Sequence, residues 1–128
     1  MEGALLSLEL SSDPAAGARA RRAVEPLLGH RLRAEEASDI LLLVTELVTN
    51  AVRHGTGATL LLTARRVADA LRVEVHNDGS SGTPEPTTGG PDGGWGLQLV
   101  EGVASAWGRS AADGRTLVWF EMRAARDA

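Results

Sequence analysis

The sequence predicts an α+β fold, a two-layer α/β sandwich in which helices cover one face of a mostly antiparallel sheet. Three observations favour this architecture. Apolar residues recur at helical spacing in the first half of the chain, two β-type runs follow each other closely in the middle, and another apolar run lies near the end. The expected order is strand, helix, helix, hairpin, loop, helix, strand.

The first elements are a strand and a helix. Residues 5–10 are short and apolar-rich, which is typical of an edge strand, and a Ser-Ser-Asp-Pro turn follows them. A helix is expected from about 14 to 28, with its cap near Ser12 or Asp13, since short polar side chains bind the free N–H groups of a first turn. Gly29 is expected to end it.

A second, central helix is expected over 35–54. Its apolar side chains recur at the spacing of one helix face: Ile40, Val44, Leu47, Val48 and Ala51. Gly55 ends the pattern. Leu42 and Leu43 lie off this stripe, so the helix is expected to be covered on more than one side.

A hairpin, a long loop, a helix and a strand are expected in the rest of the chain. Residues 58–64 and 71–76 form the predicted hairpin, joined through 65–70. Residues 77–94 hold six glycines and three prolines, and a loop of this length is often a lid or a binding segment. A helix over 97–106 with a break at Gly108 comes next, then a strand over 116–122. Trp107 in that helix and Trp119 in that strand are expected in the core.

Length and composition predict a single domain spanning 1–128 and exclude several kinds of site. The chain has no Cys, and all 13 basic residues are Arg, so thiolate metal sites, Walker-type lysines and Schiff-base chemistry are excluded. The net charge of −4 argues against a duplex-DNA footprint. No apolar run reaches the roughly 18 residues that span a membrane, so we expect a cytoplasmic protein.

A polar stripe on the central helix is the first candidate site. Glu46, Asn50 and Arg53 lie three and four residues apart, so they project from one side of the helix. One interpretation is a polar edge that faces water. The other is one wall of a ligand site, with Asn50 giving an oxygen to a hard cation and Glu46 acting as a base.

Two further segments carry candidate binding residues. Asp78-Gly79 follows a predicted strand, where a carboxylate can accept an N–H from a ligand, although this dipeptide is also a common turn signal. Gly94-Trp95-Gly96-Leu97 opens a predicted helix, where glycines allow backbone N–H groups to approach an anion. Each is weak evidence when taken alone.

Taken in order, these segments resemble the three sequence boxes of the Bergerat ATP-binding fold, which gyrase and histidine kinases share. Residues 46–55 resemble its N box, Asp78-Gly79 its G1 box and Gly94-Trp95-Gly96-Leu97 its G2 box. The G1 box departs from Asp-x-Gly-x-Gly, because its glycines stand one and four residues after Asp78. The short length and the N box are most similar to bacterial anti-sigma factor serine/threonine kinases of the actinobacterial type.

The resemblance implies a role for each candidate. Asn50 would bind Mg²⁺, Asp78 would accept a hydrogen bond from the adenine amino group, and Glu46 would be the general base. Thr116 would lie beside adenine, and Arg53 could offset charge on the γ-phosphate. The cofactor-binding residues implied by the resemblance and by position are Asn50, Arg53, Asp78, Gly79, Gly94, Trp95, Gly96, Leu97 and Thr116.

The resemblance also implies a function and partners. The protein would transfer the γ-phosphoryl group of ATP, with Mg²⁺, to a Ser or Thr of an anti-anti-sigma factor with a STAS domain. It would sequester a sigma factor. Because the family often forms dimers, a homodimer is also expected. The alternative is a nucleotide-gated module that binds a partner without phosphorylating it.

Overall fold

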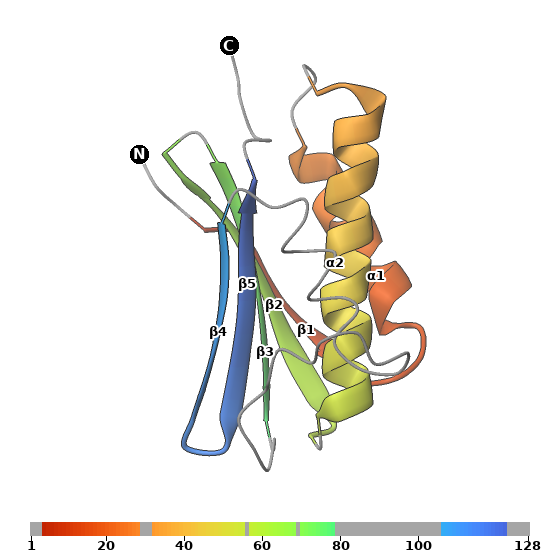
Figure 1. Ribbon diagram of the computed structural model, residues 1–128. Coiled ribbons are helices and arrows are strands. Elements are labelled where there is room, and N and C mark those ends of the chain that lie inside the picture. Colours follow the sequence, from red (N-terminus) through yellow and green to blue (C-terminus); the bar gives the residue numbers. More distant parts are fainter. Residues whose placement is uncertain (1–3, 29–31, 56, 69, 79–105, 123–128) are drawn as a thin grey trace, which may run out of the picture.

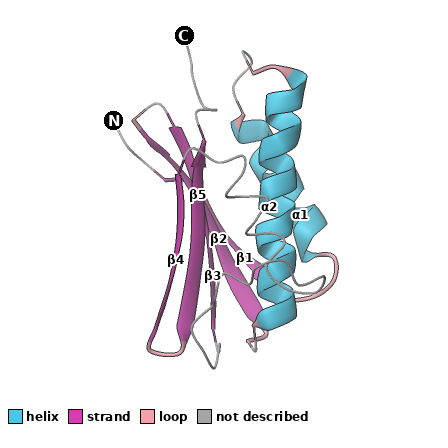
Figure 2. Cartoon of the chain, in the orientation of Figure 1, coloured by secondary structure: helices cyan, strands magenta, loops and turns pink. Residues whose placement is uncertain are grey.

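The computed structural model describes residues 4–28, 32–55, 57–68, 70–78 and 106–122. These residues form two layers, an antiparallel sheet and a pair of helices that cover one of its faces (Figures 1 and 2). The predicted α+β sandwich is therefore confirmed. Within the described ranges, neither helix combines the length and the apolar character needed to cross a bilayer.

The sheet holds five strands in the part of the chain that the structure describes. In spatial order they are β1 (Ala4–Ser11), β2 (Thr59–Val67), β3 (Ala70–Asp78), β5 (Arg115–Met122) and β4 (Ala106–Ala112). Every neighbouring pair is antiparallel. The first strand lies at an edge, as the sequence predicts.

The first helix is shorter than predicted. α1 spans Ala16–Val24, and a 3₁₀ turn, η1, spans Glu25–Leu27. Pro26 explains the early end, because proline has no N–H with which to continue the helical ladder. At the start, the Asp13 carboxylate accepts a hydrogen bond from the Ala15 N–H (2.9 Å), close to where the cap is expected. Gly29 lies outside the described residues.

The second helix, α2, agrees with its prediction. It spans Ala34–His54, and the Gly55 N–H donates to the Ala51 carbonyl (2.8 Å) where the helix ends. Its predicted apolar stripe is buried from Ile40 to Val48. Leu43 is buried as well, whereas Leu42 is 44% exposed. The helix is covered on two sides, by the sheet and by α1.

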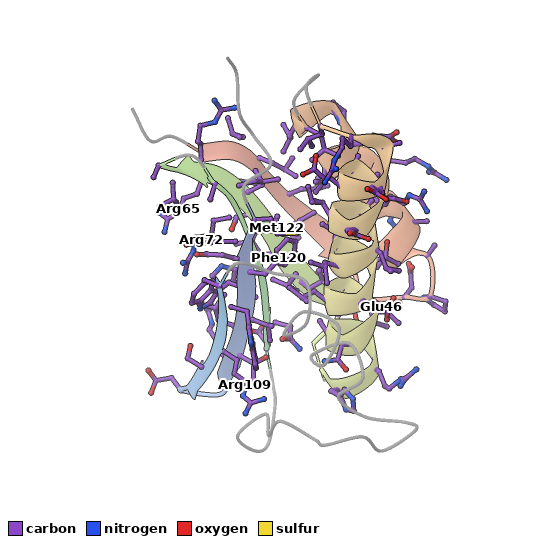
Figure 3. All side chains as sticks on the ribbon, turned by 45° about the horizontal axis from the view of Figure 1, so that its top comes forward. Glu46, Arg65, Arg72, Arg109, Phe120 and Met122 are labelled. Carbon is purple, nitrogen blue, oxygen red and sulfur yellow. The ribbon has the colours of Figure 1, made fainter. Side chains whose placement is uncertain are left out.

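The core lies between the sheet and the helices. Strand alternation gives each strand one side chain in two on this face, and the register aligns Leu62 with Val75 and Val75 with Val118 across three strands. Phe120, fully buried, lies opposite Val73 in the same layer. Figure 3 shows Phe120 and Met122 pointing between sheet and helices.

The β2–β3 hairpin has longer strands than predicted. The expected turn over 65–70 is wrong, because β2 continues to Val67 and β3 begins at Ala70, which leaves a two-residue connection. Arg65 lies opposite Arg72 in the ladder. Arg65 interrupts the apolar pattern of this strand, so the sequence there resembles a turn. Its side chain lies on the face of the sheet that the helices do not cover (Figure 3).

Strand β4 is absent from the sequence prediction. Ala106, expected to end a helix, begins this strand, and Trp107 and Gly108 lie within it; residues 97–105 of the expected helix lie outside the described residues. Trp107 packs against the edge of the core, partly buried. Trp119 is not in the core, because it projects from the opposite face of the sheet, where the Arg72 guanidinium stacks 3.9 Å from its ring centroid.

Candidate functional site

Glu46 and Asn50 of the predicted polar stripe lie to one side of the α2 surface that packs on α1. A Cβ on Gly17 of α1 would lie 3.1 Å from Thr49 Oγ1 and 3.3 Å from Thr45 Cγ2, so α1 packs closely against that side of α2. Since successive helical residues turn by about 100°, Glu46 and Asn50 lie roughly 100° and 140° from Thr45. Glu46 and Asn50 therefore lie between the side of α2 that packs on α1 and the face that packs on the sheet.

Glu46 has an unusual environment for a carboxyl group on a helix. Its side chain is partly buried, and this burial raises its pKa above the ordinary value, while the charge of Arg53 acts in the opposite direction. Asn50 is also partly buried, and Arg53 is exposed. Figure 3 places Glu46 on α2, well separated from Arg65 and Arg72 on the far side of the sheet.

Thr116 forms a hydrogen-bonded pair with a residue that the sequence analysis did not single out. The ladder aligns Thr116 of β5 with Asn77 of β3, both on the helix side of the sheet. The Thr116 hydroxyl donates a short hydrogen bond to Asn77 Oδ1, and it lies 3.4 Å from the Asn77 carbonyl oxygen. Thr116 is 7% exposed, so its hydroxyl needs a partner of this kind.

The same asparagine connects the sheet to α2. Asn77 Nδ2 donates to the Ala51 carbonyl at 3.4 Å, one residue beyond Asn50. A side chain on Gly55 would collide with this amide and would lie 2.7 Å from the Ala51 oxygen, so glycine is needed for the close approach. The structure thus brings the turn of α2 that carries Asn50 to the end of the sheet that carries Thr116.

Asp78 does not lie beside Asn77 and Thr116. It is the last residue of β3, it pairs with Arg115 in the ladder, and the two side chains form an exposed ion pair (3.4 Å). Alternation along the strand puts this pair on the opposite face from Asn77 and Thr116. Side chains alternate along a strand, so residue 77 lies on the same face as the buried Val73 and Val75, and residue 78 lies on the other face. The sequence pattern could therefore have favoured Asn77 over Asp78 for the core side.

The remaining predicted site residues, Gly79, Gly94, Trp95, Gly96 and Leu97, lie outside the described residues.

The comparisons with known proteins identify the family. The family model of the histidine kinase-like ATPase domain matches residues 10–122. The chain belongs to this family. A search among curated proteins gives no match.

A solved structure agrees with this assignment. The histidine kinase-like ATPase domain described here is similar to the crystal structure of the RsbU and RsbW domains of Rv1364c from Mycobacterium tuberculosis, with a TM-score of 0.63 and 23% identity. The match covers 96% of this chain but 34% of the other, so the present domain spans about a third of that protein. At this identity the likeness shows the fold.

The residues present suit a Mg²⁺ ion that is shared with a nucleotide. The described ranges contain no group of three His, Asp or Glu side chains able to form a metal site by themselves. Mg²⁺ in nucleotide sites is commonly held by one or two protein oxygens together with phosphate oxygens and water. The amide oxygen of Asn50, partly exposed on α2, fits this mode of binding.

Proposed function

We propose that this domain binds ATP with Mg²⁺ and transfers the γ-phosphoryl group to a Ser or Thr hydroxyl of a partner protein. One observation carries the proposal: the Glu46 and Asn50 stripe on α2 lies at the same end of the fold as the Asn77–Thr116 pair, joined to it through the Ala51 carbonyl. A base, a metal ligand and a buried polar pair would then face one ligand.

Glu46 would act as the general base. The hydroxyl oxygen of the partner would form a bond to the γ-phosphorus, the bond from that phosphorus to the bridging oxygen would break, and the hydroxyl proton would pass to Glu46. The products are a phosphorylated partner and ADP. A carboxyl group whose pKa is raised accepts a proton more readily than an ordinary one, which supports this role.

Positioning and charge stabilisation provide most of the rate in phosphoryl transfer. Asn50 would hold Mg²⁺, which when bound neutralises charge on the phosphate oxygens. Arg53, one helical turn from Asn50, would add positive charge on the same side of α2. In this proposal Gly79, Gly94, Trp95, Gly96 and Leu97 contribute the remaining nucleotide contacts.

The partner protein would be an anti-anti-sigma factor with a STAS domain, and the client a sigma factor. The motif resemblance supports this assignment, as does the fold likeness to a protein whose title names an RsbW domain. Phosphorylation would add about two negative charges to the anti-anti-sigma factor and release it, leaving this cytoplasmic domain, as a homodimer, free to hold the sigma factor.

A module that binds nucleotide and partner without phosphoryl transfer is the second candidate. The position of Asp78 favours it, because the carboxylate that the resemblance assigns to adenine is paired with Arg115 instead. A weakened nucleotide site could retain binding and lose turnover.

Incubation with γ-labelled ATP, Mg²⁺ and STAS-domain proteins separates the two candidates. The kinase proposal predicts label on a Ser or Thr of the STAS protein. Association of the two proteins without label transfer would contradict it and favour the binding module.

A further inference from the structure

The proposed phosphoryl transfer limits the direction from which a phosphoacceptor protein can arrive. In such a transfer the attacking and leaving oxygens lie roughly in line, on opposite sides of the transferred phosphorus. Asn50 would hold Mg²⁺ and the phosphates, and Glu46, the proposed base, lies one helical turn nearer the N-terminus of α2. The acceptor hydroxyl therefore approaches Glu46 over the part of α2 that precedes it.

An exposed leucine lies on that part of the helix. Leu42 is 44% exposed, one turn before Glu46 and about 40° around the helix from it. It lies about 160° from the buried Val44 of the core, so its side chain is directed away from the sheet. The other exposed large hydrophobic side chains in the described ranges, Leu5 and Leu61, are on strands β1 and β2. Leu42 thus puts an apolar group beside the proposed base.

Two acidic residues continue the same side of α2. Asp39 and Glu35 are exposed, and they lie three and seven residues before Leu42. These spacings turn a helix by about 60° and 20° from the starting direction, so the three side chains project to one side. At a rise of about 1.5 Å per residue, Leu42, Asp39 and Glu35 lie roughly 6, 10 and 16 Å along the axis from Glu46. These three residues are called the α2 strip below.

A protein whose hydroxyl reaches Glu46 covers much of the α2 strip. A stable protein interface takes about 800 Å² from each partner, which corresponds to a patch roughly 16 Å in radius. Centred on Glu46, such a patch includes Leu42 and Asp39 and reaches Glu35 at its rim. An apolar side chain on the partner would remove Leu42 from water, and positive charge is favoured opposite the two carboxylates.

We propose that the α2 strip is the docking surface for the phosphoacceptor protein. The partner meets Leu42 with an apolar side chain roughly 6 Å from its acceptor Ser or Thr, and it meets Asp39 with an Arg or Lys roughly 10 Å from that acceptor. This inference rests on the proposed function and adds the surface that selects the partner. The residues that recognise the protein are then different from those proposed to hold the nucleotide.

Phosphoryl transfer to a STAS-domain protein, measured at saturating ATP over a range of concentrations of that protein, tests the inference. Leu42→Asp should raise the KM for the STAS-domain protein about tenfold or more, because it places an unpaired carboxylate in an apolar contact. Asp39→Arg should also raise this KM about tenfold, because like charges then meet. In both variants the dissociation constant of ATP, measured by calorimetry, should stay within about threefold of wild type.

Matched controls lie on the face of the sheet that the helices do not cover. Leu61→Asp makes the same change at a leucine of similar exposure (37%), and Glu9→Arg reverses a charge at its exposed register partner on β1. Both should keep the KM for the STAS-domain protein within about twofold of wild type. If Leu42→Asp does not fold, as judged by circular dichroism, Leu42→Ala keeps a good helix former and should still raise the KM about threefold.

The outcomes separate this inference from the proposed function. Label transfer with an unchanged KM in Leu42→Asp or in Asp39→Arg would overturn the inference and leave the kinase function intact. An equal rise of the KM in Leu61→Asp or Glu9→Arg would also overturn it, since the effect would not depend on the α2 strip. A wild-type protein that labels none of the STAS-domain proteins tested would overturn the proposed function, and the inference with it.

Discussion

The indole ring of Trp119 lies against the backbone of Gly108 on the neighbouring strand. The two residues are register partners, and a Cβ on Gly108 would lie 2.7–2.8 Å from the ring atoms Cζ2, Cε2 and Nε1. The Arg72 guanidinium lies 3.9 Å from the ring centroid, so the ring is held by both strands that flank it. This contact lies on the face of the sheet that the helices do not cover.

Gly108→Ala should therefore destabilise the fold. The added methyl group displaces an indole that Arg72 holds in place, and overpacking of this kind typically costs about 1–3 kcal/mol. Urea unfolding followed by tryptophan fluorescence measures the loss. Ser110→Ala, an exposed position two residues along the same strand, is the control and should change the free energy of unfolding by less than about 0.5 kcal/mol. An unchanged midpoint in Gly108→Ala would contradict the packing described here.

The carboxylate of Glu74 predicts a loss of stability in acid. Burial acts to raise its pKa, but hydrogen bonds from Arg72 (2.6 Å) and His76 (3.0 Å) and their charges outweigh burial and lower it. A folded pKa below the unfolded value near 4.5 means that this stabilisation is present above pH 4.5 and is lost as the pH falls below it.

Glu74→Gln should therefore be less stable than the wild-type protein at pH 7 and should have a flatter dependence of stability on pH below 4.5. Chemical unfolding at a series of pH values from 3 to 7 is the measurement. Glu9→Gln, on the edge strand and exposed, is a control that keeps the net charge change equal. Parallel acid profiles for Glu74→Gln and wild type would show that Glu74 does not contribute.

The fold could be predicted from the sequence where side-chain periodicity is strong. The apolar stripe from Ile40 to Val48 predicted α2 over 35–54, and the observed helix differs from this only by beginning at Ala34. The signal is strong because one face of the helix packs on the sheet. Strand β4 has no such signal, since Ala, Gly and Ser fill most of it and Trp119 supplies the bulk from the next strand. Its one available sign was Asp113-Gly114, both with positive φ, a dipeptide typical of two-residue hairpin turns.

The site could be predicted in part for the same reason. Helical spacing was enough to place Glu46 and Asn50 on one side of α2. Asn77 was missed, because the choice between it and Asp78 depends on which strand face is buried, and that follows from the register with Thr116.

Glu46→Gln should abolish phosphoryl transfer while nucleotide binding stays within about threefold of wild type, because the amide keeps the shape but cannot take a proton. Loss of a general base typically costs a factor of about 10²–10⁴. Label transfer to a STAS-domain protein and calorimetry measure the two properties. Glu35→Gln, exposed in the first turn of α2, is the control. Full transfer activity in Glu46→Gln would remove this residue from the mechanism.

The raised pKa of Glu46 gives the same variant a second expected effect, on stability. Burial opposes ionisation of this carboxyl, so its favourable contribution is present below the unfolded pKa and is lost as the pH rises through the higher folded value. At neutral pH the ionised side chain then opposes folding. Glu46→Gln should be at least as stable as wild type at pH 7 by thermal unfolding, so loss of transfer could not be attributed to unfolding.

Asn50→Ala should remove the Mg²⁺ dependence of ATP binding. Its amide oxygen is the protein ligand proposed for the ion. Titration of ATP with and without Mg²⁺ should therefore give two similar affinities in the variant, and a stronger one with Mg²⁺ in the wild-type protein. His54→Ala, exposed one turn further along α2, should retain the wild-type difference. If Mg²⁺ strengthens ATP binding equally in Asn50→Ala and wild type, the ion is held elsewhere and Asn50 has no part in binding it.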